Sequence, residues 1–190
     1  MIAPNCACNA CNSGWMDRLD HAAEALIEPC VLGHPRRLAR IADHAIVATW
    51  ATLVGLLFSQ TQVSPPFSEA RYREFGADPR PFGGTRVWLA ATVKPPEVAL
   101  RVNGFPRGGT TVDGMQMYFA TFRINHLVVQ TFIPPEPLNE ELSFGRGSNV
   151  GFVRTLWPSP LTPVSWPPDR IVREEDLMDF AEGFLDLPAR

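Results

Sequence analysis

The first periodic stretch of the chain has the pattern of an amphipathic α-helix. After Cys11, apolar residues recur at positions 15, 19, 22 and 26, while acidic residues at 17, 20 and 24 take the other side. Asn12 and Ser13 stand where short polar side chains cap a first turn. We expect Pro29 to end this helix.

A second helix is predicted over residues 38–58. Between residues 45 and 58 it carries no charge and is apolar on every side, which is typical of a helix inside a core. A membrane span takes about 20 such residues, and this run ends sooner, so we expect no membrane contact. The N-terminal residues lack the pattern of a signal peptide, and we expect a cytoplasmic protein.

Beyond residue 84 the pattern changes to that of β-strands. The strands are expected at residues 85–91, 98–102, 115–124 and 127–133. The last two flank Asn125-His126, a two-residue turn in which Asn125 tolerates a positive φ. Residues 174–185 begin with three acidic residues, which favour a first helical turn, and continue with apolar residues at helical spacing. This pattern predicts a C-terminal helix that docks on the core. Helices followed by strands predict an α+β fold with an antiparallel sheet of about four strands and a C-terminal helix.

Composition and charge fit one globular domain. The chain has 190 residues, of which 45% are hydrophobic, enough for a sizeable core. A formal net charge of -3 provides no overall field that attracts phosphate, so any contact with nucleic acid must be local. In a reducing cytoplasm the four cysteines indicate metal ligands or buried thiols more than disulfides.

The segment Cys8-Asn9-Ala10-Cys11 has the clearest spacing of a metal-binding motif. A two-residue gap lets two thiolates bind one zinc ion from a tight turn, although the same pair fits half of a metal site or a redox pair. Cys6 is a candidate third thiolate. Cys30 is either a fourth ligand, if the first helix folds back, or a small buried residue.

The residues that follow, Cys11-Asn12-Ser13-Gly14-Trp15-Met16, resemble the Cys-x-x-Cys-Asn-x-Gly-Trp-Met element of bacterial and phage HNH endonucleases. Later short elements, among them Leu156-Trp157-Pro158, are similar to that group in the same order. The resemblance implies metal-dependent phosphodiester hydrolysis, nucleic acid as partner, and Cys8 and Cys11 as two of four structural zinc ligands. It places Asn12 at the third letter of the motif, near the catalytic metal.

The first half of that motif does not occur in this sequence. HNH chemistry needs a histidine that activates water and a divalent metal, and no histidine precedes Cys8. Asn12 alone would not hold magnesium, which needs carboxylates or several oxygen ligands. We expect His34, His44 and His126 to be structural or solvated, and His21 to be the one that could approach the cysteine turn.

Two hypotheses follow for function. The first is a relative of the HNH endonucleases that is inactive or incomplete as this chain, with the missing half in an N-terminal segment or a partner chain. It divides the chain into a partial cysteine-rich zinc knuckle at 1–14 and a single α+β domain at 15–190. The second is a non-catalytic binding or regulatory protein on the same α+β scaffold. We expect the indoles of Trp157-Pro158 and Trp166-Pro167 to cap the edge of the core, with a ligand platform as the alternative.

Overall fold

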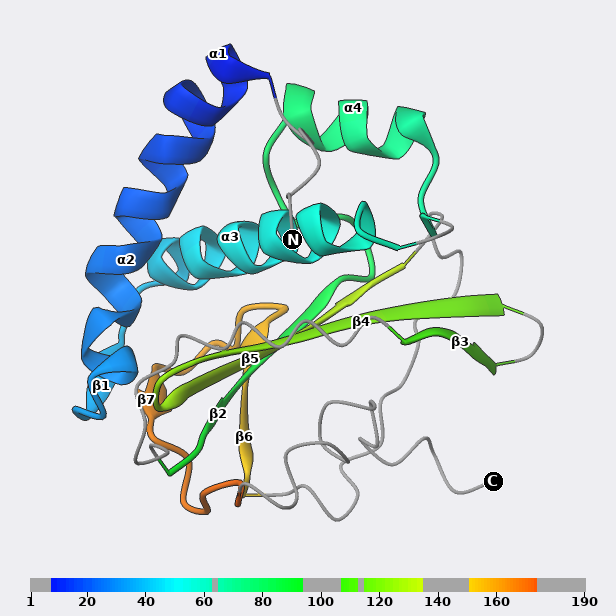
Figure 1. Cartoon of the computed structure of the whole chain (residues 1–190). Helices are drawn as coiled ribbons and strands as arrows, with labels where there is room; N and C mark the ends of the chain where they lie inside the picture. Colours follow the sequence, from blue (N-terminus) through cyan, green and yellow to red (C-terminus); the bar gives the residue numbers. More distant parts are fainter. Residues whose placement is uncertain (1–7, 63–64, 94–106, 113–114, 135–150, 174–190) are drawn as a thin grey trace.

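The computed structural model describes residues 8–62, 65–93, 107–112, 115–134 and 151–173, and the fold is α+β. Helices lie on one side of an antiparallel sheet (Figure 1). The helical segments are α1 (Asn9–Cys11), η1 (Asn12–Met16), α2 (Asp17–Val31), α3 (Ile41–Ser59) and α4 (Glu69–Ala77). The strands are β1 (Arg36–Leu38), β2 (Arg86–Ala91), β3 (Arg107–Val112), β4 (Met115–Ile124), β5 (Leu127–Ile133), β6 (Val153–Trp157) and β7 (Val164–Trp166).

Helix α3 is the central element of the core, as its uniformly apolar pattern predicts. It packs between α2 and one face of the sheet (Figure 1). Trp50 meets the ring of Phe122 edge to face, with centroids 5.4 Å apart. The hydroxyl of Tyr118 donates to the carbonyl oxygen of Gly55 at 3.0 Å, so helix and sheet are also joined by a buried hydrogen bond.

By length and hydropathy alone, α3 could cross a membrane, but 61% of its most apolar window is buried inside the fold. That burial is the arrangement expected of a core helix. The cellular location of the protein stays a prediction.

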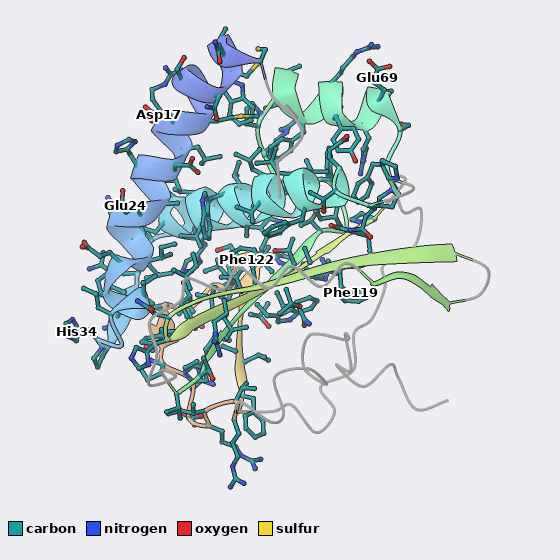
Figure 2. The ribbon with its side chains drawn as sticks, in the orientation of Figure 1. Asp17, Glu24, His34, Glu69, Phe119 and Phe122 are labelled. Atoms are coloured by element: carbon teal, nitrogen blue, oxygen red, sulfur yellow. The ribbon has the colours of Figure 1, made fainter. Side chains whose placement is uncertain are left out.

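The main sheet has the strand order β3-β4-β5-β2-β6 among the described residues, with every neighbouring pair antiparallel. The hairpin predicted around Asn125 is confirmed: Ile124 pairs with Leu127, and Asn125 has a φ of 50°. Because side chains alternate along a strand, Phe122 points toward α3 and Phe119 toward the opposite face (Figure 2).

A second, two-stranded sheet pairs β1 with β7, and the sequence pattern does not predict it. Arg36 lies opposite Trp166, and Leu38 opposite Val164. The indole Nε1–H of Trp166 donates to the carbonyl of Ala90 at 3.2 Å and ties this small sheet to β2. Trp166 is therefore a core residue, as expected of an aromatic side chain that caps the core edge.

Helix α2 has the predicted amphipathic character, with Asp17 and Glu24 on its outer side (Figure 2). The expectation that Pro29 ends it is wrong, because α2 continues to Val31. The amides of Leu32 and His34 bond the carbonyls of Glu28 and Pro29, at 2.9 and 2.7 Å, so the last turn does not depend on the missing proline N–H.

Other sequence expectations fall outside the described residues. The strand at 98–102 and the C-terminal helix at 174–185 are among them, and the division of the chain at residue 14 stays a prediction. The main sheet has five described strands where about four are expected, because β3 pairs with β4 and β6 pairs with β2, and the sequence pattern predicts neither β3 nor β6.

Candidate functional site

Cys8 and Cys11 lie on a single helical turn at the N-terminal end of the described chain. Cys8 caps α1 with extended backbone angles, φ -71° and ψ 154°, and its Sγ accepts a hydrogen bond from the backbone amide of Cys11 at 3.2 Å. The amide of Asn12 donates to the carbonyl of Cys8 at 2.9 Å and closes the turn. The structure thus brings the two predicted zinc ligands together.

The two thiols differ in acidity because they share a hydrogen bond. The Cys11 thiol and, after it, the Cys11 backbone amide donate to the Cys8 sulfur, which lowers the pKa of Cys8. The same bond raises the pKa of Cys11, since its thiol is the donor, and partial desolvation adds to the increase. Zinc binds thiolates, so Cys8 is the thiol more readily deprotonated for metal binding.

This turn fits half of a structural zinc site. Such a site takes four ligands in a tetrahedron, and in the described part of the chain no group of three or more His, Cys, Asp or Glu side chains converges. Cys6 lies outside the described residues. Cys8 and Cys11 are the two predicted ligands that lie close together among the described residues.

Gly14 marks a kink directly after the turn. Its backbone angles, φ -109° and ψ -108°, leave the helical region inside η1. Trp15 follows and packs edge-on against Phe75 of α4, with centroids 6.0 Å apart. This contact anchors the cysteine turn to the body of the fold. Asn12 itself is exposed on η1.

Cys30 does not join this turn. It lies near the other end of α2, roughly 20 Å along the helix axis from Asp17, and it is fully buried. Burial raises the pKa of its thiol to about 12. The alternative in which α2 folds back to make Cys30 a fourth ligand is wrong, because α2 is a continuous helix; the buried-thiol alternative is confirmed.

His21 does not approach the cysteine turn either. It is on the exposed side of α2, beyond the kink at Gly14, and its Nδ1 lies 2.8 Å from the carbonyl oxygen of Asp17. This contact and the Asp17 carboxylate raise the pKa of His21.

His44 is buried and bonded through both ring nitrogens. Its Nε2–H donates to the carbonyl of Leu38 at 3.0 Å, and Nδ1 lies 2.7 Å from the Ser159 hydroxyl. Nδ1 of His126 bonds the carbonyl of Thr92 at 3.1 Å, and His34 is exposed. These three positions have the structural or solvated surroundings expected of them.

A cleft of about 930 Å³ lies beside the kinked segment. Its walls come from η1 and α2, from α3, from the loop between α4 and β2, and from the end of β6. Its aromatic residues are Trp15, Phe82 and Trp157, and its charged residues are Glu74, Asp78 and Arg80. Sequence reasoning singled out Trp157 but missed the α4–β2 loop, whose one signal is its density of prolines.

Comparisons of this chain with models of protein families, with curated proteins and with solved structures find no match. The resemblance to the HNH endonucleases therefore remains a prediction based on short motifs. What the residues can do must be argued from their geometry.

Proposed function

We propose that this protein is a relative of the HNH endonucleases in which Cys8 and Cys11 supply two ligands of a structural zinc site, and that it acts in contact with nucleic acid. The observation that carries this proposal is the turn from Cys8 to Cys11, in which the sulfur of Cys8 accepts the amide hydrogen of Cys11. Hydrogen bonds to sulfur favour the thiolate, the form that zinc binds.

The remaining ligands lie outside the described residues. Cys6 is the nearest, and a four-coordinate site then takes one more from another segment or a partner chain. Bound zinc would fix the turn and neutralise the two thiolates. Trp15 packs on Phe75 and so holds the turn against α4. A zinc ion bound there would connect the segment that supplies the other ligands to this fixed turn.

Catalysis in this proposal depends on groups beyond those described. Phosphodiester hydrolysis needs a base that activates water and a metal that stabilises charge on the phosphate. Asn12 is exposed and neutral, and the Nδ1 of His21 is in contact with the carbonyl of Asp17. We therefore propose that the chain by itself does not cleave nucleic acid.

Metal content tests the zinc proposal. We expect purified chain to bind zinc, Cys8→Ser and Cys11→Ser each to lose it, and Cys30→Ala, which removes the distant buried thiol, to keep it. Cobalt in place of zinc should give thiolate-to-cobalt absorption that both serine variants abolish. Equal metal content in the wild type and both serine variants would contradict the site.

A nicking assay tests the catalytic part. We expect purified chain with magnesium or manganese to leave supercoiled plasmid intact. Nicking that disappears in Asn12→Ala and persists in Ser13→Ala would show that the chain is an active nuclease, and would overturn that part of the proposal.

A binding or regulatory role on the same scaffold is the second candidate. It is favoured by the cleft between Trp15 and Trp157, which has aromatic walls of the kind that bind ligands. The two candidates make the same prediction for the zinc turn and differ in whether an activating partner confers cleavage.

A further inference from the structure

The cleft beside the kinked segment is lined by three aromatic side chains. Its volume of about 930 Å³ is within the range of ligand pockets, roughly 300–1,000 Å³. Trp15 and Trp157 are far apart in the sequence and are both half-buried, while Phe82, which also lines the cleft, is buried. Three aromatic side chains from separate elements therefore converge on one space.

These aromatic side chains are held in place by neighbours outside the cleft. Trp15 packs edge-on against Phe75, and Phe75 packs against Phe82 with centroids 5.6 Å apart. The guanidinium of Arg71 lies 3.6 Å from the centre of the Phe82 ring. Because the aromatic positions are fixed by packing, a ring that enters the cleft loses little free energy to side-chain ordering.

The charged groups of the cleft occur as neutral pairs. Asp78 and Arg80 form an ion pair at 2.8 Å, and Glu74 pairs with Arg71 at 2.9 Å. No isolated charge of either sign is left at the cleft among the residues described, so a simple anion or cation has little reason to bind. Carboxylate acceptors and guanidinium donors instead stand side by side, which suits a neutral ring with both acceptors and donors on its edge.

We propose that this cleft binds a nucleobase, with its faces against Trp15 and Trp157 and its edge toward Asp78 and Arg80. The inference rests on the proposed function and deepens it, since it names the part of nucleic acid that the protein contacts. A net charge of -3 gives little attraction for the phosphate backbone. Base stacking, which is sequence-tolerant, supplies the affinity instead.

The test uses fluorescence anisotropy with a labelled 12-nucleotide single-stranded DNA as probe. We expect saturable binding that weakens at least about tenfold for an abasic strand of the same length and for the annealed duplex, in which the bases are stacked and paired. Affinity should fall less than about threefold between about 50 and 200 mM salt, the dependence of roughly one phosphate contact. Equal binding of the normal and abasic strands would overturn the proposal.

Variants locate the binding. Trp157→Ala should weaken binding by about tenfold, and the control Leu161→Ala, which removes an almost fully exposed side chain from the loop that follows β6, should not change it. Because Trp157 also packs against the core, Trp157→Phe is the second variant and should keep the fold while weakening binding by a few fold. Unchanged affinity in folded Trp157→Ala or Trp157→Phe would contradict the site.

Guanosine alone distinguishes two sources of the base. Binding of the nucleoside as tight as that of the strand would assign the cleft to a free nucleoside, whereas much weaker binding would assign it to a polymer. The zinc measurement separates this inference from the proposed function, because Cys8→Ser should lose zinc and still bind the single-stranded DNA probe with unchanged affinity. A chain that binds zinc but does not bind the DNA probe would refute this inference and leave the proposed function standing.

Discussion

Gly55 lies where α3 packs tightly against the sheet, and this contact gives a sharp test of the fold. A Cβ added at Gly55 would come 2.9 Å from Cδ1 of Ile133 and 3.3 Å from Cβ of Ala120. Ile133 is fully buried and Ala120 nearly so, and neither can move toward solvent. Moving α3 away instead would stretch the bond from Tyr118 to the Gly55 carbonyl.

Two effects of Gly55→Ala oppose each other. Alanine is favoured over glycine inside a helix by about 1 kcal/mol. Overpacking a filled core costs about 1–3 kcal/mol. Because both close neighbours are buried, we expect overpacking to dominate and the free energy of unfolding to fall by about 1 kcal/mol. Gly76 is the matched control: it is helical with open space around it, and Gly76→Ala should add about 0.5 kcal/mol.

Urea denaturation of a double-mutant cycle checks this reasoning. Ile133→Val removes the Cδ1 atom that meets the new methyl and by itself costs about 1 kcal/mol. In that background Gly55→Ala should be neutral or stabilising, a coupling of about 1 kcal/mol between the two positions. The reasoning is refuted if Gly55→Ala stabilises the wild type as Gly76→Ala does, or if the two substitutions are additive.

Two further predictions concern thiols and pH. In Cys6→Ser, with metal removed, we expect a thiol reagent at about pH 8 to modify Cys8 and Cys11 in the folded protein and Cys30 only after unfolding, because burial raises the pKa of Cys30 to about 12; rapid modification of Cys30 would contradict its place in the core. The Arg40 side chain donates to Asp43 and lowers its pKa below the usual 3.8, so the stability gained from this carboxylate is present above pH 4 or so and is lost as pH falls further. Urea midpoints of the wild type and Asp43→Asn should therefore converge as the pH falls below about 4, and a gap that stays constant would argue against this ion pair.

The proposed zinc turn shows how far local sequence reaches. Cys8 and Cys11 have two residues between them, so one helical turn brings them together whatever the rest of the chain does. The relationship to the HNH endonucleases, which is implied by Asn12 and its neighbours, does not follow from local geometry and stays a prediction. The sequence pattern was misleading about distance, because His21 and Cys30 belong to α2, which begins beyond the kink at Gly14, and neither joins the turn.

Strong periodicity determined the elements that sequence predicted well. A helix that is apolar on all sides can only be buried, and α3 is. Two strands joined by two residues have one register compatible with both apolar faces, and the hairpin from Met115 to Ile133 has it. In both cases the information lies within a short stretch of chain.

Only the tertiary structure decided the rest. Strands β1 and β7 have three residues each, too few for alternation to show, and they pair across more than a hundred residues of sequence. The cleft likewise joins Trp15, Phe82 and Trp157, three positions that no spacing rule connects. Such contacts form because burying the shared core fixes the distant segments together, and that free energy belongs to the whole fold and not to any one segment.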